Sequence, residues 1–330
     1  MLVLSHTDVD PLVDDAARAE LHRRLRDGIS RQGVTTDTVA PNPLRNPTSS
    51  ANYVPLLGVD ATADRATGKV LVDNPDNRAR KLPAQVSAVT LVDATTGQLL
   101  AVLHGGALTR LRTAVTSAVA TEALSSPSAH RLGLIGAGGL ALEHLRAIRA
   151  IRPVDTVTVW SRSEQTTQRF VDEVRALWDA AELEVVVAAD PREVVEASDI
   201  VCTLTPSTEP VLHGEWLRPG QHLNVVGAPP RGDHREVDGE ALRRSTLFVD
   251  HEATVRGESG DYLLARDIDG VDAPIAAELG GVLRGDHPGR TGDDEITLYD
   301  SVGTGLQDTV AAQLFLDLAR ERGAGTEVDF

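Results

Sequence analysis

The sequence has few of the features that mark secreted, membrane-spanning or metal-dependent proteins. Its single cysteine, Cys202, has no partner for a disulfide within the chain, which favours a reducing cytoplasm. No basic N-terminal region precedes an apolar run, and no apolar stretch approaches the length that spans a bilayer. We therefore expect neither a secretory signal nor a membrane span. The spacings HExxH, CxxC and G-x-S-x-G are also missing, so we predict no metal site and no serine nucleophile.

Basic residues are fewer than acidic ones. The chain has 32 Lys and Arg against 49 Asp and Glu, for a net charge of −17. This balance disfavours nucleic acids and anionic membranes as partners, because both attract basic surfaces. An anionic substrate must therefore be held by a few locally placed Arg or Lys side chains. The 330 residues, 41% hydrophobic and 25% charged, are enough for two soluble domains with their own cores.

One stretch, from Arg131 to Arg162, has the pattern of a dinucleotide-binding unit. An apolar run at residues 132–135 leads into a glycine turn at 136–139, a helical pattern follows, and a second apolar run occupies 157–160. The turn has the spacing G-x-G-x-x-A, which in a βαβ unit places pyrophosphate at the helix N-terminus. The alternative is a turn with a purely structural role. In the binding interpretation the contacting residues are Gly136, Gly138, Gly139 and Leu140.

The surrounding sequence suggests two kinds of sheet. From about residue 131 to 250, strands alternate with helices, which predicts a doubly wound parallel sheet. Before this region, the apolar runs at 86–92 and 99–103 flank a turn at Thr96-Gly97, which is typical of antiparallel strands. A strong helical pattern over 305–322 ends the chain, and we expect this helix to return to the first domain.

Other segments are less regular. Asp10, which precedes a proline, is interpreted as the N-cap of a helix that ends at Gly28. Residues 39–57 are rich in Pro, Asn and Ser and are interpreted as loop and short strand. A helix over 109–124 leads into the dinucleotide region. From residue 250 to 304 the chain is rich in Gly and Asp, and no regular element is predicted.

Short motifs spread over nearly the whole chain are more specific as a set than any one of them is alone. They begin among the antiparallel strands and continue to the start of the terminal helix. In chain order they are Lys69…Asn74-Pro75-x-Asn77, Thr95-x-Gly97, Leu108-Thr109-x-x-Arg112-Thr113-Ala114, Gly136-x-Gly138, Ser198-Asp199-Ile200-Val201…Thr205-Pro206, Pro219-Gly220…Asn224-x-Val226-Gly227, Arg235-Glu236-x-Asp238, Glu258-Ser259-Gly260-Asp261 and Ser301-Val302-Gly303.

Together and in this order, the motifs resemble the ornithine cyclodeaminase/mu-crystallin family. The resemblance implies an α/β fold with a Rossmann doubly wound parallel sheet and a second, α+β domain built from both chain ends. We accordingly expect a substrate-binding and dimerisation domain over residues 1–115 and 304–330, and a dinucleotide-binding domain over residues 116–303. The family also implies a homodimer that forms through the substrate domains.

The resemblance assigns the substrate carboxylate to three cations. Arg112 matches an arginine at the junction of substrate and cofactor, and its planar guanidinium suits a carboxylate better than a point charge does. Lys69 matches a lysine that faces the substrate, and Arg45 a further carboxylate-binding position; Lys69 and Arg112 are the implied catalytic residues. Val302 is an implied substrate contact. The cofactor contacts implied besides the glycine turn are Arg112, Thr113, Ser161, Arg162, Thr203, Thr205, Asn224, Val226, Gly227 and Ser301.

The residues after the second strand of the dinucleotide unit bear on the type of cofactor. NAD-selective units usually carry Asp or Glu there, which accepts hydrogen bonds from the ribose hydroxyls. This chain has Ser161-Arg162 instead, and no carboxylate. Ser161 can bond a 2′-phosphate and Arg162 can pair with it, so we favour NADP(H), with NAD(H) as the alternative.

The clearest departure from the family concerns proton transfer. In the cyclodeaminases an Asp follows shortly after the glycine matched by Gly227 and handles a substrate proton. Pro229 stands at that place here, and proline cannot transfer a proton. Asp233 or His234 can take over only if the loop folds back; the alternative is a surface loop. The missing Asp makes the sequence more similar to the imine and ketimine reductases of the family.

We therefore predict an NAD(P)H-dependent oxidoreductase that reduces a small imino acid, cyclic or open-chain, to the amino acid. Lys69 or a bound water is the expected proton source for imines that need one, with Asp233 as a weaker candidate. One alternative is an ornithine-type cyclodeaminase, an NAD-dependent ammonia-lyase. The other is a non-catalytic, NADPH-dependent protein that binds a small ligand.

Overall fold

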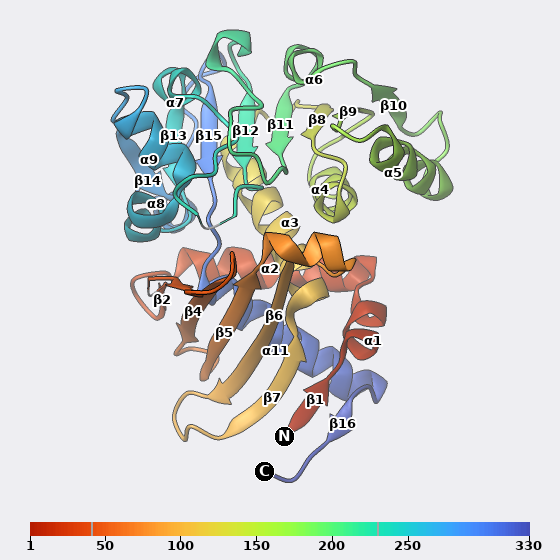
Figure 1. Ribbon diagram of the computed structural model, residues 1–330, viewed down its shortest axis with the longest axis vertical. Coiled ribbons are helices and arrows are strands. Elements are labelled where there is room, and N and C mark those ends of the chain that lie inside the picture. The colour runs from red at the N-terminus through yellow and green to blue at the C-terminus, as the bar shows by residue number, and fades with distance from the viewer. Residues whose placement is uncertain (41, 230) are drawn as a thin grey trace. The chain divides into compact units, whose positions relative to one another are not determined.

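The computed structural model describes residues 1–40, 42–229 and 231–330, and the chain divides into two compact units. The terminal unit comprises Met1–Thr113 and Gly303–Phe330, and the central unit comprises Ala114–Val302. Helix α3 (Gly105–Leu124) begins in the first and continues into the second. Each unit has its own sheet (Figure 1).

The described part of the central unit is built on eight parallel strands in the order β10-β9-β8-β11-β12-β15-β13-β14. From β10 to β12 this is the Rossmann order, in which the chain changes direction between β8 and β11. The predicted doubly wound parallel sheet is therefore confirmed. The strands are β8 (Arg131–Ile135), β9 (Thr156–Trp160), β10 (Glu184–Val187), β11 (Ile200–Thr203), β12 (His222–Val225), β13 (Thr246–Val249), β14 (Ile275–Glu278) and β15 (Thr297–Asp300).

Helices connect these strands, and the apolar core lies between helices and sheet. Val201, Leu223 and Leu298, from three neighbouring strands, are among the buried residues of that core. The glycine turn predicted from sequence lies between β8 and α4, as expected. The helices are α4 (Gly139–Arg149), α5 (Glu164–Leu177), α6 (Pro191–Ala197), α7 (Gly239–Arg244), α8 (Glu252–Glu258), α9 (Gly260–Asp267), α10 (Leu279–Arg284) and the 3-10 turn η3 (Gly214–Trp216).

The expectation that residues 250–304 lack regular structure is wrong. This segment forms α8, α9, β14, α10 and β15, and β15 lies between β12 and β13 in the sheet. The reason is length and burial. All four residues of β15 are buried, so the strand shows no alternation of apolar and polar residues, and the helices are too short to establish a helical period.

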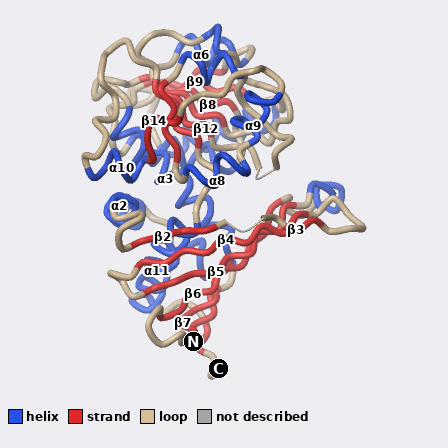
Figure 2. Tube along the Cα trace, turned by 90° about the vertical axis from the view of Figure 1, so that its left-hand side faces the viewer, coloured by secondary structure: helices blue, strands red, loops and turns tan. Residues whose placement is uncertain are grey.

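The terminal unit holds a second sheet with the order β16-β1-β7-β6-β5-β4-β2, and β3 pairs with β4 at one end (Figure 2). The antiparallel pairing predicted for β6 and β7 is confirmed, whereas β1 and β7 run parallel. The strands are β1 (Leu2–Leu4), β2 (Thr36–Val39), β3 (Leu44–Arg45), β4 (Asn52–Asp60), β5 (Arg65–Asp73), β6 (Gln85–Asp93), β7 (Leu99–His104) and β16 (Thr326–Glu327).

Helix α11 (Gly305–Arg322) packs on β4 and β5, so the terminal helix does return to the first part of the chain. Two glycines permit this close contact: a Cβ on Gly305 would lie 2.2 Å from the carbonyl carbon of Leu57, and one on Gly58 would lie 2.2 Å from that of Gly305. The first turns of α11 are buried all round, and they carry the polar residues Gln307 and Asp308 into the interior.

Two predictions for the N-terminal region need correction. The long helix is α2 (Asp15–Ser30), and its N-cap is Asp14, whose side chain accepts from the N–H of Ala17; residues 6–12 form the short turns α1 (His6–Val9) and η1 (Asp10–Leu12). Within residues 39–57, predicted as loop and short strand, β3 is indeed short, but residues 52–57 belong to the nine-residue strand β4. Pro55 is tolerated there because it lies between the stretches that pair with β3 and β2, where β4 has only β5 beside it. The remaining element is the 3-10 helix η2 (Pro75–Arg80).

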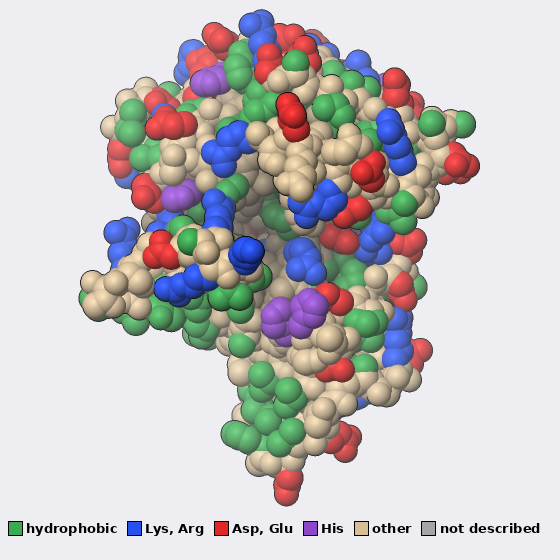
Figure 3. Space-filling view, turned by 45° about the vertical axis from the view of Figure 1, so that its right-hand side comes forward, with side chains coloured by type: hydrophobic (Ala, Val, Ile, Leu, Met, Phe, Trp, Pro, Cys, Tyr) green, Lys and Arg blue, Asp and Glu red, His purple; other side chains and the backbone are tan. Residues whose placement is uncertain are grey.

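The surface carries charges of both signs. On the face drawn in Figure 3, basic and acidic side chains are interspersed, so the net negative charge is not gathered in one patch there. Among the helices within the described ranges, none is long and apolar enough to cross a membrane.

Candidate active site

In the terminal unit, Lys69 and Arg112 meet at one buried carboxylate, that of Asp308. Lys69 Nζ donates to Asp308 Oδ1 at 3.1 Å and to Thr109 Oγ1 at 2.9 Å. Arg112 Nε donates to the same Oδ1 at 3.2 Å. The side chains of Lys69 and Asp308 are fully buried, and that of Arg112 is 7% exposed. Because two cations share one carboxylate, the cluster keeps a net positive charge.

Three different elements bring this cluster together. Lys69 lies on β5, where Thr67, Lys69 and Leu71 alternate inward, Arg112 lies on α3, and Asp308 lies on the first turn of α11. Burial lowers the pKa of Lys69 to about 8; Asp308 raises it and the charge of Arg112 lowers it further. Lys69 therefore releases a proton more readily than an exposed lysine.

The guanidinium of Arg112 is held but not saturated. Nη1 donates to Gln307 Oε1 at 2.9 Å, in addition to the bond from Nε to Asp308. An arginine has five N–H donors, so the outer edge of the fork keeps donors that no described residue accepts. That edge has the geometry that binds a carboxylate with two parallel bonds.

The structure does not bring Arg45 into this cluster. Arg45 is exposed on the two-residue strand β3, opposite Asn52 of β4. It shares a sheet face with Lys69, because Asn52 and Leu56 alternate on β4 and Leu56 is opposite Lys69. Four residues along a strand span about 13 Å, so Arg45 lies towards the far end of that face from the pair.

In the central unit, the glycine turn has the shape that a dinucleotide phosphate requires. Gly136 has φ +110°, and a Cβ there would lie 2.8 Å from the carbonyl oxygen of Leu204, so only glycine fits. A Cβ on Gly138 would meet nothing within 4 Å, and Gly138 and Gly139 are exposed. No side chain caps α4, so the N–H groups at its start, including that of half-buried Leu140, are open to an anion.

Ser161 and Arg162 follow β9, the strand next to β8. Arg162 is exposed, Ser161 is half-buried, and no carboxylate stands at either position. The hydroxyl of Ser161 accepts from the N–H of Ser163 at 3.4 Å, a weak bond that leaves it free to turn towards a ligand.

Three further predicted cofactor contacts, Thr203, Thr205 and Gly227, stand at the carboxyl ends of β11 and β12. All three donate to the carboxylate of Glu236, which the sequence analysis had not singled out. Asn224 has no exposed side-chain surface: its Nδ2 donates to Thr121 Oγ1 at 2.9 Å. The predicted contact between Asn224 and the cofactor is therefore not supported by the position of its side chain.

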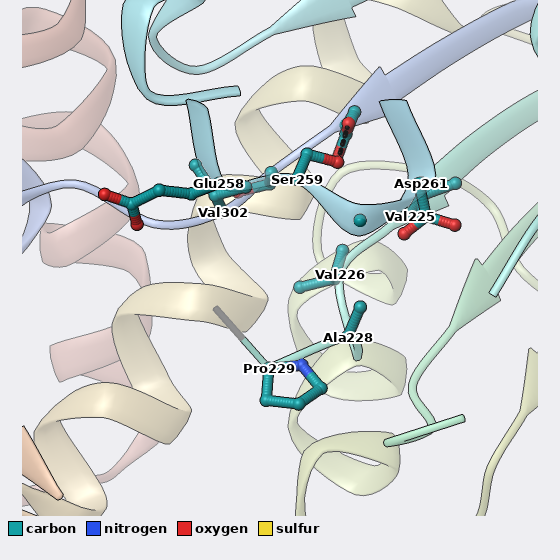
Figure 4. Close-up of a pocket in the computed structure, with 11 residues that line it drawn as sticks. Val225, Val226, Ala228, Pro229, Glu258, Ser259, Asp261 and Val302 are labelled. Carbon is teal, nitrogen blue, oxygen red and sulfur yellow. Dashed lines mark hydrogen bonds between the residues drawn. The ribbon is translucent and has the colours of Figure 1, made fainter. Parts of the chain in front are cut away.

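A small pocket at the same edge of the sheet is lined by Val226, Pro229, Glu258, Ser301 and Val302, among others (Figure 4). Glu258 extends from the end of α8 and points away from Asp261. Burial, and then repulsion by Asp250, raises the pKa of Glu258 to about 7, so its carboxyl group holds a proton part of the time at neutral pH.

Other predicted residues differ in their surroundings. Ser301 Oγ donates to Asp250 Oδ2 at 3.0 Å, Val302 is half-buried, and Thr113 is buried at the boundary of the terminal unit.

The side chain of Asp233 is 76% exposed, and its bond with His234 holds its pKa below the usual range. A carboxylate so exposed and so easily ionised is poorly suited to donate a proton, so Asp233 gains no support.

Sequence reasoning missed Asp308, Glu236 and Glu258. The last two lie inside motifs that carried the resemblance, but no pattern in the sequence marks the surroundings that set their roles. Asp308 had a visible indication, since Gln307 and Asp308 interrupt the apolar start of α11.

Comparisons with known proteins cover most of the chain. Residues 52–323 match the ornithine cyclodeaminase/mu-crystallin family. The mouse protein ketimine reductase mu-crystallin is 34% identical over 279 residues, which are 83% of this chain and 84% of the mouse protein.

Two solved structures extend the likeness to the fold. One is Thermococcus litoralis Δ1-pyrroline-2-carboxylate reductase in complex with NADH and L-proline, with a TM-score of 0.92, 29% identity, and coverage of 99% of this chain and 100% of that one. The other is the iminosuccinate reductase of Paracoccus denitrificans with NAD⁺, with a TM-score of 0.88, 27% identity, and coverage of 100% and 99%. The chain thus belongs to the ornithine cyclodeaminase/mu-crystallin family.

Proposed function

We propose that this protein reduces a small imino acid to the amino acid with a nicotinamide dinucleotide as hydride donor. The observation that carries the proposal is the pairing of Lys69 and Arg112 around Asp308, which leaves net positive charge inside a chain of net charge −17. Relatives whose names specify a ketimine, a pyrroline carboxylate or an iminosuccinate support the C=N substrate class.

The substrate carboxylate is assigned to the outer edge of Arg112, with Lys69 beside it. Asp308 fixes both cations, so the site needs no reorganisation when the anion arrives. Arg45 lies about 13 Å from this pair along the sheet face, so we do not assign it to the same carboxylate. Thr113 and Val302 keep their proposed contacts with cofactor and substrate.

The dinucleotide is assigned to the central unit. The open N–H groups of the glycine turn hold its pyrophosphate, and the loops after β11 and β12 receive its other half. When bound, the cofactor supplies the hydride that reduces the C=N carbon.

In the central unit, the group that we propose as a proton donor is Glu258, which acts in its neutral form. Since its pKa is about 7, kcat/KM is expected to fall as pH rises above 7, because less of the enzyme then carries the proton. Glu258→Gln should lower the rate by about 10²-fold or more and abolish this limb of the pH profile. Glu252→Gln, on the exposed start of the same helix, is the control and should keep both. Burial, and then repulsion by Asp261, also raises the pKa of Glu236 to about 7. The role of Glu258 is therefore ruled out if Glu258→Gln leaves both the rate and the fall of kcat/KM above pH 7 unchanged.

Reduction is favoured over cyclodeamination by Pro229. Pro229 lines the pocket next to Ala228. The cyclodeaminases that this sequence resembles carry an Asp at the position of Pro229, and proline has no proton to exchange. A protonated imine is already electrophilic, so its reduction needs fewer proton transfers than the deamination of a diamino acid.

For the cofactor we propose a preference for NADPH over NADH. Ser161 and Arg162 offer a hydroxyl and a cation at the place where a carboxylate would repel a 2′-phosphate. Ser161→Asp combined with Arg162→Ala should shift the ratio of kcat/KM for NADPH and NADH towards NADH by about tenfold or more, since it removes a charged contact and adds a repulsive one. An unchanged ratio would show that the two positions do not select the cofactor.

We further propose a homodimer in the cytoplasm. The sheet face of the terminal unit opposite α11 is apolar and exposed: Val39, Tyr53, Leu57, Val70 and Val86 share it and are between 36 and 51% exposed. A contiguous apolar face of this kind is typical of protein interfaces. Light scattering should give twice the mass of the chain, and a monomer at micromolar concentration would contradict the proposal.

The reaction itself is tested with a matched pair of substrates. A cyclic imine that bears a carboxylate should oxidise NADPH, whereas the same ring without the carboxylate should react at least about a hundredfold more slowly, because Arg112 and Lys69 then have no substrate carboxylate to bind. Equal rates for the two substrates would show that Arg112 and Lys69 do not bind a substrate carboxylate.

A further inference from the structure

The carboxylate of Glu236 joins two loops of the central unit. Oε1 accepts from the N–H of Thr205 at 2.5 Å and from its hydroxyl at 2.8 Å. Oε2 accepts from the hydroxyl of Thr203 at 2.8 Å and from the N–H of Gly227 at 2.6 Å. Glu236 has no exposed surface, so these four bonds account for its whole carboxylate.

The loops held in this way lie at the edge of the sheet where parallel α/β folds bind ligands. The loop after β11 also touches the glycine turn, because a Cβ on Gly136 would lie 2.8 Å from the carbonyl oxygen of Leu204. The two loops touch each other as well, since a Cβ on Gly227 would lie 2.1 Å from the nitrogen of Thr205. The turns after β8, β11 and β12 therefore form one continuous surface.

We propose that Glu236 is a positioning residue for the dinucleotide: it fixes the loops after β11 and β12 in the conformation that receives the nicotinamide half of the cofactor. This inference rests on the proposed function, because it presupposes that the central unit binds a dinucleotide. Glu236 does not touch the cofactor itself in this proposal, since within the described part of the chain its buried oxygens accept from these four donors.

The pattern of donors explains why the residue is a carboxylate and not an amide. Each oxygen faces one backbone N–H, which cannot turn round to accept a bond. A glutamine in either orientation would place its NH₂ group against one of these two N–H groups and leave a buried donor unpaired. Asp261 fixes the backbone at Glu236, since its Oδ1 accepts from the N–H groups of Glu236 and Val237 at 2.7 and 2.8 Å.

The test compares Glu236→Gln with Glu295→Gln. Glu295 likewise accepts from a backbone N–H, that of Thr291, and from the hydroxyls of Thr246 and Thr291, but it stands two residues before β15, at the opposite edge of the sheet. NADPH fluorescence gives the dissociation constant of the dinucleotide, and steady-state kinetics give kcat and KM for the imino acid. Glu236→Gln should weaken NADPH binding about tenfold or more with a smaller change in KM for the imino acid, whereas Glu295→Gln should leave NADPH binding within about twofold.

A second variant keeps the test decisive if Glu236→Gln does not fold. Thr203→Val removes one donor from a side chain that is 1% exposed and keeps its shape. On its own it should weaken NADPH binding about threefold. Where Glu236→Gln does fold, the double variant should bind NADPH about as weakly as Glu236→Gln, because both substitutions act through the same loops. If the wild type and these variants bind NADPH equally well, the role of Glu236 is overturned and the proposed function is not affected. Wild-type protein that binds neither NADPH nor NADH would overturn the proposed function.

Discussion

Arg112→Ala is expected to lower kcat/KM for an imino acid by about 10²- to 10³-fold while the protein stays folded. The reason is that the carboxylate loses its planar, two-bond partner in a nearly buried site, where such a truncation costs about 3–4 kcal/mol. Lys69 still donates to Asp308, so the cluster keeps a cation for its carboxylate. Steady-state oxidation of NADPH measures the loss.

Arg110→Ala is the matched control for Arg112→Ala. Arg110 lies two residues earlier on the same helix, its side chain is 44% exposed, and its ion pair with Asp10 is at the surface. Its loss should change kcat/KM by less than about twofold. If Arg112→Ala loses less than about threefold, Arg112 does not bind the substrate carboxylate.

Asp308→Asn is expected to lower the free energy of unfolding by about 3–5 kcal/mol, because it leaves two buried cations without a counter-charge. That is a large share of the about 5–15 kcal/mol by which domains are usually stable. Urea denaturation measures the change. Asp317→Asn is the control on the same helix: its carboxylate is 39% exposed and pairs with Arg24, so its loss should cost about 1 kcal/mol or less.

The effect of Asp308→Asn should depend on pH. Lys69 has a pKa of about 8 in the folded protein against 10.5 ordinarily, so the unfolded chain binds more protons between these values and the wild type gains stability as pH rises through them. Asp308 raises the pKa of Lys69, so in Asp308→Asn this pKa is lower and the variant begins to gain stability at a lower pH than the wild type. The difference between their free energies of unfolding should therefore narrow as pH approaches 8. If Asp308→Asn lowers the free energy of unfolding at every pH by no more than Asp317→Asn does, Asp308 does not balance two buried cations.

The sequence predicted those parts of the fold in which a period or a turn repeats over enough residues. The glycine turn at Gly136, the alternation through β8 to β12 and the terminal helix α11 were all within reach. Strand β15 was not, because four buried residues show no alternation, and α8 and α9 were too short to establish a helical period.

Of the buried cluster, only the two cations were predicted from the sequence. Lys69 and Arg112 were identified through resemblance, yet their partner Asp308 lies some 200 positions along the chain from Arg112, and only folding brings it to β5 and α3. The same holds for Glu236 and Glu258. The role of Glu236 depends on donors at the ends of two neighbouring strands, and that of Glu258 on burial and on the charge of Asp250. Neither set of surroundings can be read from one sequence.

The most direct test of the central claim sets reduction against cyclodeamination in one set of assays. NADPH and NADH are mixed separately with cyclic imino acids, and loss of absorbance by the reduced nicotinamide is followed; NAD⁺ with ornithine, followed by ammonia release, is run in parallel. We expect oxidation of one reduced cofactor per imino acid consumed, with NADPH preferred, and no ammonia from ornithine. Ammonia release from ornithine without turnover of any imino acid would contradict the proposed function.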